Sequence, residues 1–309
     1  MKYSEPSVVS ESLEALLESY EKNVGTNFID ERRLPEAIVI NTVMEDLLEV
    51  LFPGSSGKRE ITSENLTYVV GDMLTSIRND LKDQLLLAYR HECKIKECQY
   101  DLCETKAQAA VDLLISKLPA VRSVLKRDVL AAFEGDPAAT SIEEIVISYP
   151  GIKALAIHRI AHILYQQKVP LIPRMISEIS HSQTGIDIHP GATIGVGIMI
   201  DHGTGVVIGE TTVIGDNVKI YQGVTLGALS FPKDACGKLI RDQKRHPTID
   251  DNVTIFAHAT ILGNIRIGRN SLVGSNVWLK DDVPENTMVL SEPPKQTYRA
   301  VRAPAGEQS

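Results

Sequence analysis

The sequence predicts an α+β protein in which an all-helical N-terminal domain precedes a parallel β-solenoid of six-residue repeats. Apolar residues recur every six positions between 188 and 283, and short polar segments separate them. No helix has this period, so the pattern is typical of a hexapeptide solenoid, in which three units close one coil. Upstream, apolar residues lie three and four apart, as on amphipathic helices. The repeat positions are Ile188, Ile194, Ile200 and Val206, then Ile208, Ile214, Ile220 and Leu226, and finally Ile249, Ile255, Ile261, Ile267, Val273 and Leu279.

The helical domain is expected to span residues 1–184. Ser141 followed by Glu144 is a capping-box pattern that begins a short helix. Proline ends other helices, and we expect one of them to stop at Pro119. The amphipathic stretches are 41–51, 66–90, 105–118, 121–133 and 151–167, with a last helix that ends near 181.

Two departures interrupt the solenoid predicted over 185–291. The six-residue count slips by two at Val206-Val207, and the charged segment 228–247 breaks the pattern altogether. A buried solenoid wall cannot hold such a segment, so we expect an extruded loop, and long loops in compact domains are often functional. The tail at 292–309 is rich in proline and is expected to be irregular.

Composition and charge disfavour several classes of protein. The net charge of −8 argues against a nucleic-acid binder, whose footprint would be a basic stripe. No apolar run approaches the length needed to cross a bilayer, and the first twenty residues lack the pattern of a signal peptide. The sequence therefore predicts a soluble cytoplasmic protein. The cysteines show no CxxC spacing, so we expect reduced thiols rather than a disulfide or a metal site.

Asp187 and His202 are the first candidates for catalysis. They lie fifteen residues apart, and one coil is about eighteen residues, which places them on neighbouring coils. A carboxylate bonded to one imidazole nitrogen fixes the tautomer and leaves the other nitrogen free to act as a base. Alone, His202 would be read as a structural corner residue. The adjacent Asp201, the nearby glycines and Arg245-His246 in the extruded loop favour the catalytic interpretation.

A three-histidine metal site is the main rival interpretation. His189, His202 and His258 all lie in the solenoid, and zinc catalysis needs three protein ligands and an open position. His158 and His162 are four apart on a predicted helix, but they lack the HExxH pattern and an obvious third ligand. We therefore expect a structural or interface role for that pair, and no metal site in the protein.

Five segments, taken in order, resemble the serine O-acetyltransferases of the hexapeptide-repeat acyltransferase superfamily, in particular a subgroup with a longer N-terminal region. One hexapeptide run would indicate only the superfamily, whereas the ordered set is far more specific. The resemblance covers about 136–283 and, more loosely, the helices before it. The segments are Asp187-Ile188-His189-Pro190, Gly197-Ile198-Met199-Ile200-Asp201-His202, Thr204-Gly205-Val206-Val207-Ile208-Gly209-Glu210-Thr211, Gln222-Gly223-Val224-Thr225-Leu226-Gly227 and Lys244-Arg245-His246-Pro247.

This resemblance implies a left-handed parallel β-helix and acetyl transfer from acetyl-CoA to the hydroxyl of L-serine. The products would be O-acetyl-L-serine and CoA, the first step of cysteine biosynthesis. Because the thioester is already activated, no tightly bound cofactor is expected. The matched positions are His202 as the base and Asp187 as its partner, Asp136 and Asp201 for the substrate amino group, Arg245 for its carboxylate, His246 near its side chain, and Gly227, Ala228, Ala257 and Ser275 along the CoA arm.

The resemblance also implies partners. Sites in such solenoids usually lie between subunits, so we expect a homotrimer or a dimer of trimers, with the helical domain contributing to oligomerisation and to the serine site. Cysteine is a plausible feedback inhibitor at the same amino-acid clamps. The chain ends in Ser309, whereas members that dock into O-acetylserine sulfhydrylase end in isoleucine, so that complex is not expected. His258 stands where many relatives carry glycine, which would reshape the CoA channel.

Two further hypotheses stay open at this point. A hexapeptide O-acetyltransferase that acts on a sugar or another hydroxyl would keep the base but would have no need for amino-acid clamps. A non-enzymatic scaffold would need neither, and the loss of His202 would then affect stability alone.

Overall fold

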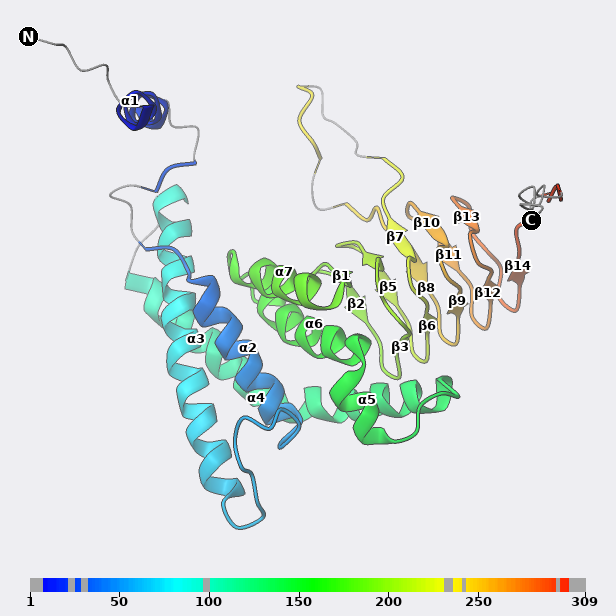
Figure 1. Cartoon of the computed structure of the whole chain (residues 1–309), viewed down its shortest axis with the longest axis horizontal. Coiled ribbons are helices and arrows are strands. Elements are labelled where there is room, and N and C mark those ends of the chain that lie inside the picture. The colour runs from blue at the N-terminus through cyan, green and yellow to red at the C-terminus, as the bar shows by residue number, and fades with distance from the viewer. Residues whose placement is uncertain are drawn as a thin grey trace, which may run out of the picture.

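The computed structural model describes residues 8–21, 26–28, 33–96, 101–230, 236–240, 243–292 and 295–299. Within these residues a group of helices leads into a stack of short strands (Figure 1). The helices are α1 (Val8–Glu21), α2 (Ala37–Leu51), α3 (Leu66–Lys96), α4 (Asp101–Gly135), α5 (Ile142–Ser148), α6 (Pro150–Gln166) and α7 (Ile172–Thr184).

The strands form three parallel sheets that the chain visits in turn. Sheet A has the order β1-β4-β7-β10-β13, sheet B has β11-β8-β5-β2, and sheet C has β14-β12-β9-β6-β3. Three strands therefore close one coil, and the coils form a left-handed parallel β-helix, an exception to the right-handed crossover rule. The strands are β1 (Asp187–Ile188), β2 (Thr193–Ile194), β3 (Met199–Ile200), β4 (Val207–Ile208), β5 (Val213–Ile214), β6 (Lys219–Ile220), β7 (Thr225–Gly227), β8 (Thr248–Ile249), β9 (Thr254–Ile255), β10 (Thr260–Leu262), β11 (Arg266–Ile267), β12 (Leu272–Val273), β13 (Trp278–Leu279) and β14 (Met288–Val289).

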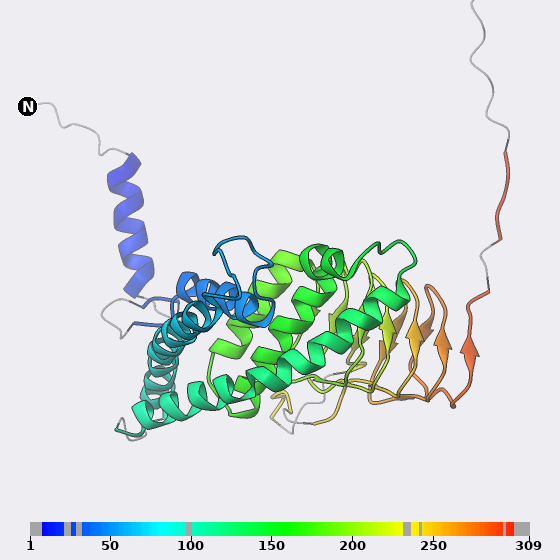
Figure 2. The same cartoon turned by 90° about the horizontal axis from the view of Figure 1, so that it is seen from below.

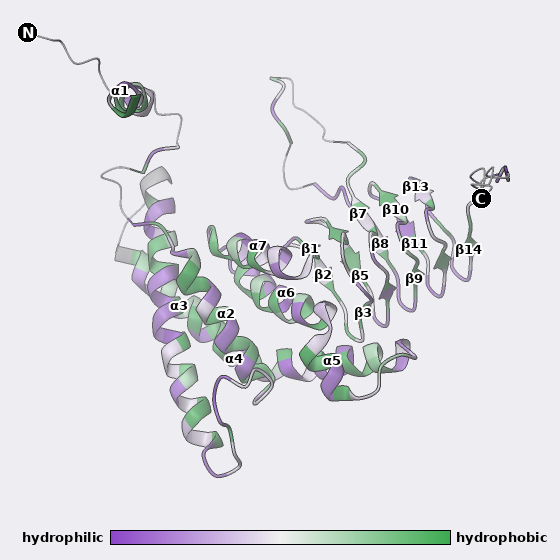
Figure 3. Ribbon diagram, in the orientation of Figure 1, coloured by the Kyte–Doolittle hydropathy of each residue, from purple (hydrophilic) through white to green (hydrophobic). Residues whose placement is uncertain are grey.

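The second residue of most strands points into the solenoid and builds its core, as the six-residue period predicts. Ile188 lies opposite Ile208, which lies opposite Leu226, and Leu226 lies opposite Ile261. All four side chains are buried. Apolar residues accordingly mark the strands in Figure 3, while the corners between them are largely hydrophilic. Each coil thus covers the apolar face of the coil before it.

The two extra residues of the repeat lie in the corner after β3, not at Val206-Val207. Met199 and Val207 begin strands eight positions apart, whereas the equivalent residues one coil later, Lys219 and Thr225, are six apart. As a result Ile208, rather than Val206, lies over Ile188. The insertion therefore falls within the corner that carries His202.

Three local expectations have different outcomes. Ser141 caps α5 and its Oγ accepts a hydrogen bond from the Glu144 amide, which confirms the capping prediction. The break predicted at Pro119 is wrong, because α4 runs through it. Leu118 and Val121 are buried on either side of this exposed proline, so packing maintains the helix. The expectation of reduced thiols is wrong for Cys93, which is disulfide-bonded.

α4 and α6 attach the helical region to the first coil. α4 is the long helix that runs toward the solenoid in Figure 2, and both helices contact β3. Gly151, in the first turn of α6, permits this approach, because a Cβ there would lie 2.3 Å from the Ile200 carbonyl oxygen. Among the described helices none is long and apolar enough to cross a bilayer.

A buried ion pair also joins the two regions. Asp128 of α4 is fully buried and accepts two hydrogen bonds from Arg159 of α6, at 3.0 and 2.8 Å. Its other oxygen accepts the Ile198 amide at 2.9 Å, while Arg159 donates to the Gly195 carbonyl at 2.8 Å. Burial raises the pKa of Asp128, although Arg159 opposes this.

We predict that Asp128→Ala destabilises the protein by about 3–5 kcal/mol, because it leaves the Arg159 charge buried without a counter-ion. The check is the midpoint of denaturant unfolding followed by circular dichroism. Asp112→Ala is the matched control, since Asp112 pairs with Arg78 in solvent and its loss should not move the midpoint measurably. Equal midpoints for the two variants would contradict the prediction.

Candidate active site

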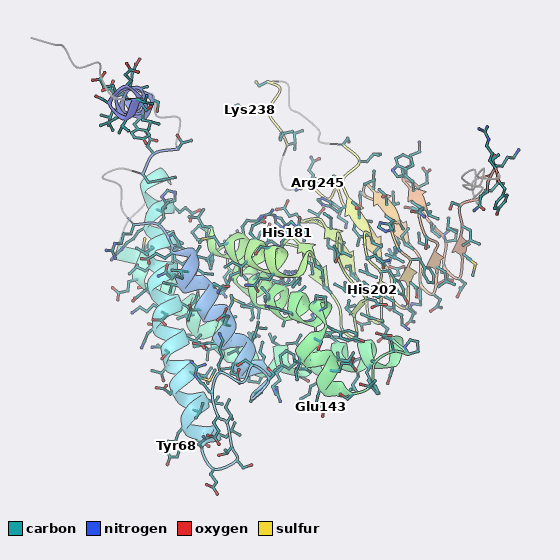
Figure 4. The ribbon with its side chains drawn as sticks, in the orientation of Figure 1. Tyr68, Glu143, His181, His202, Lys238 and Arg245 are labelled. Atoms are coloured by element: carbon teal, nitrogen blue, oxygen red, sulfur yellow. The ribbon has the colours of Figure 1, made fainter. Side chains whose placement is uncertain are left out.

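The candidate residues gather at two different corners of the solenoid. The CA corner joins sheet C to sheet A, and the AB corner joins sheet A to sheet B. His202 lies on the side of the solenoid nearer α5, and Arg245 lies on the side of the extruded loop (Figure 4). On successive coils the CA corner comprises 201–206, 221–224, 256–259 and 274–277, and the AB corner comprises 189–192, 209–212, 228–247 and 263–265.

His202 projects from the CA corner because of the two-residue insertion. Its backbone adopts a left-handed conformation with φ of 55°, and Gly203 and Gly205 on either side of Thr204 also have positive φ. The His202 side chain is 71% exposed, so a substrate or a second chain can reach the imidazole. Its Nε2 lies 3.6 Å from Oδ2 of Asp201, which is ion-pair distance but longer than a hydrogen bond.

The helical region brings a second carboxylate to this corner. Asp136 follows α4, and its Oδ2 accepts a hydrogen bond from the Tyr149 hydroxyl at the start of α6. Its Oδ1 accepts the Ala138 amide at 2.8 Å. Tyr149 and the Ala138 amide hold the pKa of Asp136 below its usual value, and the charge of His202 acts in the same direction. The bond to Asp136 raises the pKa of Tyr149 to about 12, so this hydroxyl stays a donor.

Asp187 forms no hydrogen bond or ion pair with His202 within the described part of the chain. It begins β1, lies opposite Val207, and donates its backbone N–H to the Val206 carbonyl at 2.9 Å. The ion-pair contact of His202 runs instead to Asp201, its neighbour in sequence. A count of fifteen residues placed Asp187 and His202 on adjacent coils. The coil in question is twenty residues long, and its extra residues are those that carry His202 outward.

Arg245 at the AB corner is held by a carboxylate that the sequence did not single out. Its guanidinium pairs with Glu210, and Glu210 also accepts a hydrogen bond from the Tyr165 hydroxyl at 2.7 Å. Burial alone would raise the pKa of Glu210, yet Tyr165 and Arg245 hold it below its usual value. The Tyr165 ring meets His189 edge-on, with centroids 5.7 Å apart.

His246 is fixed beside Arg245 by Thr211. Its Nδ1 accepts the Thr211 amide at 3.1 Å, which leaves the proton of the neutral ring on Nε2. The Thr211 hydroxyl in turn accepts the backbone amides of Arg245 and His246, at 3.0 and 3.1 Å. Burial, together with the charge of Arg245, lowers the pKa of His246 to about 4. His246 is therefore neutral at physiological pH and can donate through Nε2.

The residues expected along the CoA arm divide between the same two corners. Gly227 ends β7 and Ala228 follows it at the AB corner, whereas Ala257 and Ser275 lie on successive coils of the CA corner. His258 also belongs to the CA corner, and a Cβ on Gly223 would lie 2.1 Å from its Nδ1. Its ring thus lies over Gly223 of the preceding coil.

The rival three-histidine arrangement is not assembled within one chain. His189 lies at the AB corner, and His202 and His258 lie at the CA corner. Across the part of the chain that the structure describes, no three His, Cys, Asp or Glu side chains are grouped to hold a metal ion.

Sequence reasoning missed Tyr149, Glu210 and Tyr165, which support Asp136 and Arg245. Only Glu210 carried a signal, because it lies in one of the five quoted segments. Both tyrosines lie at the ends of α6, far in sequence from the groups they contact. No local sequence pattern predicts these contacts.

Comparison with known proteins places these observations in a family. Residues 246–281 match the family model described as bacterial transferase hexapeptide (six repeats). A protein of Synechococcus elongatus named serine acetyltransferase, plasmid, is 47% identical over 259 residues, which cover 83% of this chain and 81% of that one. The chain belongs to the serine acetyltransferase family. A Bacillus subtilis serine acetyltransferase is 46% identical over 55% of this chain and 74% of its own.

Solved structures agree over nearly the whole length. Serine acetyltransferase isoform 3 of Entamoeba histolytica, in complex with cysteine, has a TM-score of 0.71 and 34% identity, covering 94% of each chain. The soybean serine acetyltransferase complexed with serine has a TM-score of 0.53 and 32% identity, covering 82% of this chain and 97% of its own. The expected fold and family are thereby confirmed.

We predict that stability falls as the pH is lowered from about 6.5 toward 4. The unfolded histidine has a pKa of about 6.5, so in this window the unfolded chain binds more protons than the native one. His246, with its pKa of about 4, and buried His158, whose pKa also lies well below normal, both act in this direction. Stability from these groups is complete above pH 6.5.

Thermal unfolding between pH 8 and 4.5 measures this slope. His246→Gln should flatten the slope, and His181→Gln, on the exposed part of α7, should keep it. A slope unchanged by His246→Gln would contradict the assignment of a neutral, buried His246.

Proposed function

We propose that this protein transfers the acetyl group of acetyl-CoA to the hydroxyl of L-serine, giving O-acetyl-L-serine and CoA, with His202 as the general base. The carrying observation is an open imidazole beside two carboxylates at the CA corner, with a guanidinium at the AB corner. Serine needs all three, because its ammonium, carboxylate and hydroxyl each need a partner. A sugar acceptor would use the base and leave both clamps without a role.

The proposed reaction is a direct acyl transfer. The serine hydroxyl is a weak nucleophile at neutral pH and needs a base at hydrogen-bond distance. His202 takes its proton as the new C–O bond forms at the thioester carbonyl. The tetrahedral intermediate then expels the CoA thiolate, which recovers the proton from the imidazolium. A backbone N–H near Gly227-Ala228 is the proposed donor to the oxyanion.

Asp136 and Asp201 are proposed to bind the substrate ammonium, Arg245 to bind its carboxylate, and His246 to lie near its side chain. The low pKa of Asp136 supports its part, since it keeps that carboxyl charged. His246 would donate from Nε2, while Arg245 would share its charge between Glu210 and the substrate. Asp187 remains the proposed partner of the base, and Asp201 competes with it for that role because of its 3.6 Å contact.

We further propose that the complete site forms between two copies, the CA corner of one facing the AB corner of the next. The proposed base and ammonium clamp lie at one corner, and the proposed carboxylate clamp lies at the other. A contact between two different surfaces is heterologous and closes as a ring rather than as a twofold dimer. Three solenoids side by side give the smallest such ring, a homotrimer, and the helical domains can pair two trimers.

Cysteine is proposed to compete with serine at the same clamps. It carries the same ammonium and carboxylate and differs only in its thiol. Two Entamoeba histolytica relatives were solved in complex with cysteine, which supports this proposal.

We predict that CoA release from acetyl-CoA depends on L-serine and falls about 10²–10⁴-fold in kcat in His202→Ala, as expected for loss of a general base. Thiol release is followed with L-serine, with a simple sugar and without acceptor. Asp187→Asn should lower kcat, whereas Arg245→Ala should mainly raise the KM for serine. Release that is equal with a sugar and with serine would remove the amino-acid clamps from the proposal.

A second prediction concerns the shared site. At a serine concentration well below the KM of Arg245→Ala, His202→Ala and Arg245→Ala should each be poorly active alone. Mixed oligomers made by unfolding and refolding them together should recover activity at that concentration. Some interfaces in the mixture pair an intact CA corner with an intact AB corner. A mixture of His202→Ala with Asp136→Ala is the control, because both changes fall at the same corner. No recovery in a mixture shown to be co-assembled would place the whole site in one chain.

A further inference from the structure

Trp278 is a large side chain left in solvent near the far end of the CA corner. It is the only tryptophan of the chain, it begins β13, and it is 57% exposed. Nearby Tyr221 and Phe256 stack on each other, with centroids 5.4 Å apart, whereas no ring contact joins Trp278 to another described residue. The exposed indole therefore leaves a flat aromatic face open to a ligand.

Trp278 lies on the same edge of the solenoid as His202. The corner of His202 leads into β4, and the corner of Ser275 leads into β13, in the same sheet. β4, β7, β10 and β13 are consecutive neighbours in that sheet. Three strand spacings of about 4.8 Å separate the two corners, which makes roughly 14 Å.

The strip between His202 and Trp278 is bordered by small residues and by the His258 ring. Gly205 has no side chain there, His258 covers Gly223, and the next coils contribute Ala257 and Ser275. Ala257 and Ser275 are also the positions expected along the CoA arm, and their order sets a direction from the reacting thioester toward β13. A donor with its thioester at His202 therefore has its nucleotide end near Trp278.

We propose that the indole of Trp278 stacks on the adenine base of acetyl-CoA and so determines the affinity for the donor. This inference rests on the proposed function. Stacking needs only a flat π-face, which every nucleobase has. Lys280, two residues further on, lies on the same outward face of sheet A and forms no ion pair with any residue that the structure describes. It offers a cation to the phosphates of the donor.

Fluorescence tests the contact directly. Because Trp278 is the sole tryptophan, the tryptophan emission of the full-length protein, excited selectively over its tyrosines, reports on this residue alone. We expect saturable quenching by CoA and none by pantetheine, which has the thiol arm but no adenine, at concentrations that inhibit turnover. Unchanged emission at a CoA concentration that saturates the enzyme would overturn the proposal.

Steady-state kinetics measure how much Trp278 contributes to the affinity for acetyl-CoA. Trp278→Ala should raise the KM for acetyl-CoA about ten-fold, the order expected from loss of one base–aromatic stack. kcat and the KM for serine should not change, and Trp278→Phe should recover most of the affinity. With S-acetyl-pantetheine as donor, Trp278→Ala and wild type should be equal. Met288→Ala, an exposed residue at the same end but in sheet C, is the matched control.

Three other outcomes would contradict either the adenine contact or the proposed function. An unchanged KM for acetyl-CoA in Trp278→Ala, with serine-dependent turnover intact, overturns the adenine contact and leaves the proposed function standing. If light scattering shows that Trp278→Ala differs in oligomer mass from wild type, the indole belongs to a contact between copies. That result also overturns the adenine contact. Wild-type protein without serine-dependent release contradicts the proposed function instead, and quenching by CoA can still be measured in that protein.

Discussion

The register in which the coils stack is the constraint on which the rest of the structure depends. Each strand has only two or three residues, so it is held by the parallel strands of the coils on either side and by one buried aliphatic side chain. Ile208 over Ile188 is one such step. Because this register is strict, the position of a residue within its six-residue unit decides which corner or face it occupies. Functional side chains can therefore occupy a corner without any change in the buried core.

Corners accept extra residues, and this protein uses that freedom twice. The two-residue insertion at the CA corner carries His202 out of the coil, and the longer insertion 228–247 between β7 and β8 contains Arg245 and His246 near its end. Neither insertion disturbs the inward column, since Ile208 and Ile249 return to register. The CA and AB corners lie on different edges of the same solenoid. Under the proposed function, a site that needs both groups would be completed where two solenoids meet.

The helical region shapes the site through contacts that are distant in sequence. Asp136 comes to the CA corner because α4 is anchored at Asp128, and Tyr149 meets it because Gly151 lets α6 approach Ile200. At the other end of α6, Tyr165 supports Glu210 and hence Arg245. α6 therefore supports Asp136 beside the CA corner and Glu210 at the AB corner, so the two regions act as a single frame for the proposed site.

The sequence by itself determined the solenoid, the helical region before it and the extruded loop, because periodicity and charge are local properties that dictate the path of the backbone. It also identified His202, Asp201, Asp136 and Arg245 as candidates. Only the tertiary structure decided that α4 continues through Pro119, that the ion-pair contact of His202 runs to Asp201, and that Glu210 and Tyr165 support Arg245. These outcomes depend on the packing of distant helices and on one coil of twenty residues. A local sequence pattern predicts neither the packing nor the length of that coil.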